Sequence, residues 1–393
     1  VTEGRQPPAD DAAKAAAGDA FAETPAHHHP EHPSGPHQHG HSLYELDEFL
    51  DAPPEEAIAD AEVSLQRRLF NWRTIGSIVF ALVLVFLLFR VILNVDLAST
   101  IDVIKSASPT LLLAAFVVYY LTFPLRSFRW WLVLRNVGTR VKYRDATEIL
   151  FLSWFVNCLV PAKLGDLYRA YLMRGNYNAS ISRTVGTIFL ERIADLVLIF
   201  TLALAAGFWS FRGRNRPEVD ALFITGFIFI AILVIFLMVL RSHGQRLTRF
   251  LPHRAQDLYE RFHEGSTGAM RPTVLAEVGV VTAGIWLLEG GRIYFVIQSL
   301  NLPGVHLGIS ASIFVAMGAS LLTAIPLTPA GIGFVQGGIV LMLGLYGVPA
   351  HAATAVALVD FVISTLSVIV IGGILYAFSG KIRRAHGGGP APG

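Results

Sequence analysis

Long apolar runs alternate with short basic segments from about residue 75 to the end of the chain. A helix of about 20 apolar residues spans the hydrocarbon core of a bilayer. The chain therefore reads as an all-α polytopic membrane protein with about six full spans. These runs are Ile75–Val95, Thr110–Phe123 with an extension at either end, Thr184–Trp209, Ala221–Leu240, Val274–Leu300 and Ala353–Phe378.

Two further apolar runs are interrupted and predict broken or re-entrant helical hairpins. Phe151–Arg174 contains Pro161, which removes a backbone donor from a helix, and Gly165, which permits close approach. The second interruption is PLTPAGIG, between Ile309–Ile325 and Ile332–Tyr346. The order of span, span, broken hairpin and span thus occurs twice, a pattern compatible with two inverted repeats.

Basic segments predict the orientation, because positive charge marks the cytoplasmic side of membrane proteins. The segment after the second run is strongly basic, with Arg126, Arg129, Arg135 and Arg140, and another basic segment spans residues 241–271. Placing both inside predicts a multi-pass protein of a bacterial-type cytoplasmic membrane with both termini in the cytoplasm. The arginines at 212, 214 and 216 are the exception, since they fall outside.

Composition sets the domain boundaries. Residues 1–66 are rich in Ala, Pro and His and predict a disordered tail, whose histidines leave weak metal binding open as the less favoured alternative. Residues 67–380 form the transmembrane domain, with halves of about 67–211 and 217–380, and residues 381–393 form a short disordered tail. The net charge of +2 gives no indication of nucleic-acid binding. No Walker A, HExxH or GxSxG motif occurs, so no catalytic residue, metal site or cofactor is predicted.

Charged residues inside the apolar runs are the candidate site. The interruption at Pro161 is followed by Lys163, Asp166 and Arg169. Charges at the bilayer centre cost about 3 kcal/mol each, so they pair with one another or face a cavity. Both roles stay open for the remaining charges in the spans, which are Glu191, Arg192, Asp195, Glu289 and Arg292. Asp360 is predicted to be a helix-contact residue, with a proton carrier as the less favoured alternative.

The second interruption offers an anion site at a helix N-terminus, where unpaired amides suit a phosphate. A tight turn between two spans is the equally acceptable alternative. The residues concerned are Pro326, Pro329, Gly331, Gly333 and Gln336.

Three motifs in order resemble the lysylphosphatidylglycerol synthase transmembrane-region family, also called flippase-like. The first contains Asn157, Pro161, Gly165, Asp166 and Arg169, the second Glu191, Arg192 and Asp195, and the third Pro326, Pro329, Gly331 and Gly333. The likeness covers about residues 70–380. Three positions depart from the family pattern: Lys163 stands where Arg is usual, Ala330 replaces a glycine, and Gln336 stands where Glu is common. The aminoacyl-transferase domain of the full synthases does not follow the last span.

The resemblance and the charged breaks together predict a protein that binds and translocates a phospholipid or another lipid with a phosphate-bearing headgroup. Lys163, Arg169 and Arg192 are expected to hold the phosphate, and catalysis is the less favoured reading. The alternative is a membrane accessory or enzyme that handles polyprenyl-phosphate-linked sugars in envelope glycolipid assembly. Membrane lipids are the expected partners. A separately encoded lipid-modifying enzyme and a homo-oligomer stay open.

Overall fold

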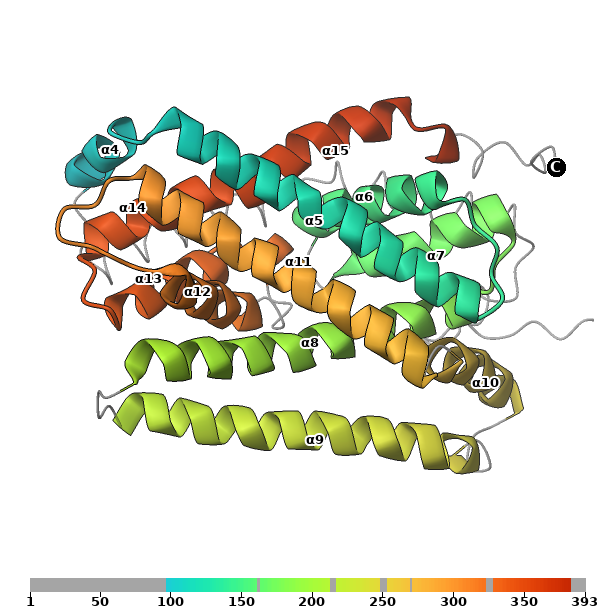
Figure 1. Cartoon of the computed structure of the whole chain (residues 1–393). Coiled ribbons are helices and arrows are strands. Elements are labelled where there is room, and N and C mark those ends of the chain that lie inside the picture. The colour runs from blue at the N-terminus through green and yellow to red at the C-terminus, as the bar shows by residue number, and fades with distance from the viewer. Residues whose placement is uncertain are drawn as a thin grey trace, which may run out of the picture. The chain divides into compact units, whose positions relative to one another are not determined.

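The computed structural model describes residues 97–160, 163–212, 217–247, 253–268, 271–322 and 328–382, and every regular element in these ranges is a helix (Figure 1). Several predictions lie partly or wholly outside them. They include the N-terminal tail 1–66, the first span Ile75–Val95, the arginines at 214 and 216, most of the C-terminal tail 381–393, and the residues Pro161 and Pro326.

The helices follow the apolar runs. The first part contains α4 (Leu97–Lys105), α5 (Pro109–Asn136), α6 (Tyr143–Leu159), α7 (Leu164–Tyr177) and α8 (Ile181–Phe211). The second contains α9 (Pro217–Leu247), α10 (His253–Thr267), α11 (Pro272–Ser299), α12 (Ile309–Leu322), the short 3₁₀ turn η3 (Pro329–Gly331), α13 (Phe334–Gly344), α14 (Ala350–Phe361), the π-helical turn η4 (Val362–Leu366) and α15 (Ser367–Phe378). Within the described ranges, α5, α11 and the continuous stretch Ala350–Phe378 are long and apolar enough to cross a membrane.

Both predicted interruptions occur. The helix ends at Leu159 and resumes at Leu164, and the second break separates α12 from α13. The local cause is the same at both places: Lys163, Ala330 and two glycines adopt positive φ angles that a helix does not contain. The two breaks therefore place irregular backbone inside the helical bundle.

The basic segment after the second apolar run is the main correction to the sequence analysis. The prediction of a cytoplasmic loop at Arg126 and Arg129 is wrong, because α5 continues as one helix to Asn136 and buries both side chains to 3% exposure. Trp130 is completely buried beside them. The reason is long-range: the carboxylates that pair with these arginines lie on α8 and α11.

Helices α5 and α11 lie side by side and run in opposite directions (Figure 1). Ser108 at the start of α5 donates its backbone N–H to the carbonyl of Ser299 at the end of α11, at 2.7 Å. Helix α11 also packs closely on α12, because a Cβ on Gly290 of α11 would lie 2.6 Å from the Ile313 side chain of α12. Small residues at helix contacts are typical of membrane bundles.

The two helices share a sequence register. Each begins with a Pro-Thr pair, at Pro109 and Pro272. Seventeen residues later, α5 has Arg126 and α11 has Glu289, and twenty residues later the helices have Arg129 and Arg292. The breaks are also alike: PAKLG at 161–165 corresponds to PAGIG at 329–333.

The contacts between α5 and α11 are reciprocal in this register. Arg126 pairs with Glu289, the residue at its own position in the other helix. Arg129 donates to Thr282 at 3.0 Å, while Arg292 lies over the ring of Tyr119 at 5.2 Å. Thr282 and Tyr119 each lie ten residues into their helix.

The folded part extends into the predicted C-terminal tail. Lys381 is 8% exposed, and its Nζ lies 2.8 Å from Asp145 Oδ2 at the start of α6. Helix α15 packs on α6, where a Cβ on Gly372 would meet the side chain of Phe155 at 2.6 Å. The last described residues thus hold the C-terminal segment against the first hairpin.

Candidate functional site

The first break is held by Asn157 and Gly165. The Asn157 side chain accepts a hydrogen bond from Gly165 N–H at 2.9 Å and so caps the second half of the hairpin. Only glycine fits at 165, since a Cβ there would lie 2.1 Å from the carbonyl oxygen of Ser153. Lys163 precedes α7 in a left-handed conformation, with φ +54°. The bend therefore places a lysine between the two helix ends.

The second break is built from a run of positive φ angles. Ala330, Gly331 and Gly333 have φ of +51°, +71° and +90°. Gln336 Oε1 then accepts a hydrogen bond from Gly333 N–H at 2.6 Å, which caps the start of α13. Pro329 lies in the preceding 3₁₀ turn. The predicted helix N-terminus exists, and its first donor is already occupied by Gln336.

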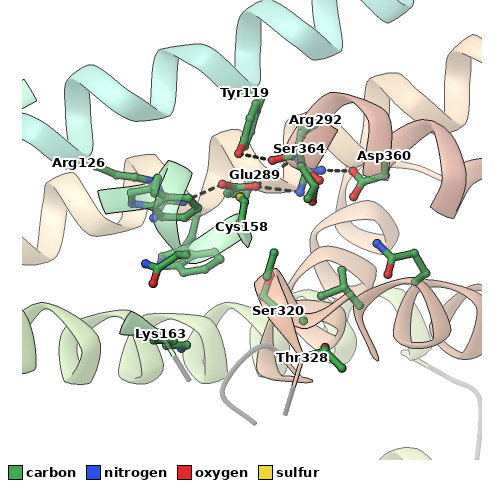
Figure 2. Close-up of a pocket in the computed structure, with 18 of the residues that line it drawn as sticks. Tyr119, Arg126, Cys158, Lys163, Glu289, Arg292, Ser320, Thr328, Asp360 and Ser364 are labelled. Atoms are coloured by element: carbon green, nitrogen blue, oxygen red, sulfur yellow. Dashed lines mark hydrogen bonds and ion pairs between the residues drawn. The ribbon is translucent and has the colours of Figure 1, made fainter. Parts of the chain in front are cut away.

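A cavity of about 170 Å³ lies between the two breaks. The first hairpin contributes Asn157, Cys158 and Lys163, and the second contributes Gly331 and Gln336. Helices α5, α8, α11 and α14 complete the wall with charged and aromatic side chains (Figure 2). A buried water needs roughly 10–15 Å³ on this measure, so the space holds on the order of ten waters or a small polar headgroup.

One wall of the cavity is a chain of alternating charges (Figure 2). Arg126 of α5 donates to Glu289 Oε1 of α11 at 2.7 Å, and Arg292 donates to Glu289 Oε2 at 2.9 Å. Arg292 also donates to Asp360 of α14. The Arg126 guanidinium lies 4.5 Å from the ring centre of Trp154. This wall is electrically neutral.

A second ion-pair cluster lies behind the cavity. Arg129 donates to Asp195 at 2.5 and 3.2 Å and to Glu191 at 3.2 Å. Arg169 donates to the other oxygen of Glu191 at 2.7 Å and lies over Trp130 at 4.5 Å. All four charged side chains are at most 6% exposed. This cluster ties α5, α7 and α8 together and has no free charge.

A further ion pair joins α7 of the first hairpin to α8. Arg192 donates to both oxygens of Asp166, at 2.7 and 3.0 Å. Lys163, half-buried and on the cavity wall, forms no salt bridge with any residue in the described ranges. It is therefore the cation that a ligand meets without breaking an existing pair.

The predicted site residues divide into three groups. Those on the cavity wall are Asn157, Lys163, Arg192, Glu289, Arg292, Gly331 and Gln336. Those that support the wall from outside are Gly165, Asp166, Arg169, Glu191, Asp195, Pro329 and Gly333. Pro161 and Pro326 lie outside the described residues. Arg169 was expected on the phosphate, but the structure gives it a buried ion pair instead.

Sequence reasoning missed the aromatic and α5 residues of the wall, which are Tyr119, Arg126, Trp154 and Trp286, and gave Asp360 only a helix-contact role. One signal was available: the offsets of Arg126 and Arg129 from Pro109 equal those of Glu289 and Arg292 from Pro272. Among the described residues, no group of His, Cys, Asp or Glu side chains is arranged to hold a metal ion.

Two interrupted helices around a charged cavity, inside a bundle of long apolar helices, define a polytopic membrane protein with a central polar site. Residues 74–372 match the family model of the lysylphosphatidylglycerol synthase transmembrane region. The chain belongs to this family.

Archaeal proteins are among its relatives. A UPF0104 membrane protein of Methanocaldococcus jannaschii is 34% identical over 56% of this chain and 93% of its own length. Another, from Methanothermobacter thermautotrophicus, is 25% identical over 69% of this chain and 86% of its own length. The glycosyltransferase AglD of Haloferax volcanii is 27% identical over 72% of this chain, and this match spans about half, 51%, of AglD.

Proposed function

We propose that this chain binds a lipid with a phosphate-bearing headgroup in the cavity and moves it across the membrane. The observation that carries the proposal is Lys163, a cation on the wall of a central cavity with no salt bridge in the described ranges. A half-buried lysine without a salt bridge has lost part of its hydration without compensation, and an anionic ligand supplies the missing partner. Arg169 is paired with Glu191, so Lys163 is placed first among the predicted phosphate contacts.

The cavity volume and the apolar outer surface together are compatible with a lipid whose headgroup alone is enclosed. The wall encloses about 170 Å³, enough for a headgroup and too little for acyl chains. Apolar side chains on the outer faces of the helices remain exposed, for example Phe227 at 69% and Val280 at 74%. In this arrangement the headgroup enters the cavity while the chains stay in the bilayer.

The shared register of α5 and α11 supports translocation. We propose that α5–α8 and α11–α15 are inverted repeats and that both breaks are re-entrant. The pair Arg126–Glu289 then lies at the pseudo-twofold axis, since each residue holds the same position in its repeat. Inverted repeats give transporters two equivalent arrangements around one central site, open to opposite sides.

The experiment compares lysine variants in reconstituted vesicles. Lys163→Ala should slow translocation of a fluorescent anionic phospholipid by about 10- to 100-fold, because a hydrogen bond to a charged group contributes about 1.5–3 kcal/mol. Lys163→Arg should keep most of the rate. Lys105→Ala is the matched control, since this lysine is 73% exposed on α4. A Lys163→Ala protein that is monodisperse and translocates at the parental rate would refute the proposal.

The similarity to a glycosyltransferase favours one second candidate, in which the chain assists or carries out a reaction on polyprenyl-phosphate-linked sugars. A transferase needs a carboxylate that is free to act as a base. Glu191 and Asp195, two carboxylates of α8, are both engaged by Arg129 behind the cavity. Transfer of a labelled sugar from a polyprenyl phosphate by the purified chain would establish the catalytic form of this candidate, and no transfer together with intact lipid translocation would exclude that form.

A further inference from the structure

The charged side chains in and around the cavity do not balance, because six cations accompany five carboxylates. The cations are Arg126, Arg129, Lys163, Arg169, Arg192 and Arg292. The carboxylates are Asp166, Glu191, Asp195, Glu289 and Asp360. Every carboxylate has an arginine partner, so the one positive charge in excess is that of Lys163. The matching ligand carries a single negative charge.

The cavity offers no free carboxylate to a cationic group. Glu289 uses both oxygens on arginines, with Oε1 to Arg126 and Oε2 to Arg292. Asp360 uses Oδ1 on Arg292; its Oδ2 atom has no hydrogen-bond partner in the described ranges, but it is buried and presents no surface to a ligand. An ammonium group in the headgroup would therefore have to displace an arginine. Like charges in close contact cost several kcal/mol, which disfavours such a headgroup.

The remaining polar groups on the wall are neutral. Thr365 lines the cavity with a hydroxyl, and Asn157 and Gln336 line it with amides. Gln336 accepts from Gly333 N–H through Oε1, which leaves its NH₂ group as a donor with no hydrogen-bond partner in the described ranges. Trp154 and Trp286 add aromatic faces. Neutral donors and acceptors beside aromatic rings suit a headgroup that carries hydroxyl groups.

We infer that the cavity selects a phosphodiester headgroup with one negative charge and otherwise only uncharged hydroxyl groups, and that the neutral side chain of Gln336 leaves a cationic headgroup without a carboxylate partner. This inference rests on the function proposed above. A glycerophospholipid with a polyol headgroup and a polyprenyl-phosphoryl sugar share this chemistry. A phosphate monoester with a second negative charge and a zwitterionic headgroup do not.

Gln336 gives a direct test, since Gln336→Glu changes charge with little change in shape. The carboxylate of the variant can still accept from Gly333 N–H, so the cap of α13 is retained. The variant also provides the free carboxylate that the natural cavity lacks. Gln336→Met is the matched control, because it removes the polar group and adds no charge.

The experiment measures lipid retention by native mass spectrometry of the purified full-length chain, after incubation with equimolar mixtures of defined lipids. The lipids are phosphatidylglycerol, a polyprenyl-phosphoryl hexose, phosphatidylethanolamine and phosphatidic acid. We expect one or both phosphodiester polyols to be retained about tenfold or more over the zwitterion and the monoester. Whichever of these two phosphodiester lipids is retained identifies the class of lipid that the cavity binds. Gln336→Glu should lower this preference about tenfold, and Gln336→Met should lower it less.

Three outcomes overturn the inference. Equal or better retention of phosphatidylethanolamine or phosphatidic acid by the parent chain removes the headgroup assignment and leaves phosphate-lipid binding intact. An equal loss of lipid preference in Gln336→Glu and Gln336→Met would show that the preference does not depend on the charge at position 336. Retention of none of the four lipids removes the inference together with the proposed function.

Discussion

Neutralising Arg292 alone should destabilise the protein far more than neutralising Arg292 together with Asp360. The side chains of these residues are 9% and 1% exposed. Arg292→Gln leaves Asp360 without its salt bridge, whereas Glu289 keeps Arg126 at 2.7 Å. Breaking a buried pair from one side costs about 3–5 kcal/mol, while replacing both partners is often close to neutral. The coupling energy between the two substitutions should therefore be about 2–4 kcal/mol.

The assay is reversible unfolding in mixed micelles, followed by tryptophan fluorescence. We compare Arg292→Gln, Asp360→Asn and the double variant, with Lys105→Gln plus Asp102→Asn as the exposed control pair. The control should show no measurable change, because exposed ion pairs contribute little. Glu289→Gln with Arg292→Gln should fail to rescue, since it leaves Arg126 and Asp360 both unpaired. Losses of the two single variants that simply add in the double variant would refute the pairing.

Two further predictions use adjacent or local controls. Gly290→Ala should lower the stability by about 1–3 kcal/mol through overpacking, because its Cβ would lie 2.6 Å from Ile313. Gly291→Ala is the control and should leave the stability unchanged, because its Cβ would meet nothing closer than 3.5 Å. Equal thermal midpoints of the two variants in detergent would contradict this prediction. Burial holds the pKa of His263 in α10 below its usual 6.5, so the unfolded state binds more protons. The packing of α10 should keep its full stability above about pH 6.5 and lose stability as the pH falls toward the lowered pKa of His263. Limited proteolysis should therefore be faster at pH 5.5 than at pH 7.5. The variant His263→Gln should remove this pH dependence.

The sequence predicted both interruptions because their causes are local. A proline, nearby glycines and a lysine at the first break are visible in a few consecutive letters. Left-handed conformations at Lys163 and Gly331 fall where PAKLG and PAGIG correspond. Most boundaries of the long helices also followed from the lengths of the apolar runs.

The charged wall could not be predicted in the same way, because its partners lie far apart in sequence. Arg126 and Glu289 are separated by 163 residues, and Arg129 and Asp195 by 66. A local rule that assigns arginines to loops therefore misplaced both arginines. Sequence proximity also fails to identify the critical partner of Arg292. Glu289 lies three residues before Arg292 and pairs with it, but Glu289 also pairs with Arg126. Asp360, which is distant in sequence, forms its salt bridge with Arg292.

The ion pair between Arg126 and Glu289 has a consequence for how such a protein can arise. A homodimer of a single repeat would set the residue at this position against its own copy. Arginine would then face arginine, or glutamate would face glutamate, at the centre of a membrane. Only two genes, or one gene with two halves, can supply opposite charges at corresponding positions. Under the proposed inverted-repeat arrangement, the pair would mark divergence after duplication, and an attempt to reduce this fold to a symmetric dimer of one half would have to begin by replacing both residues with an uncharged pair.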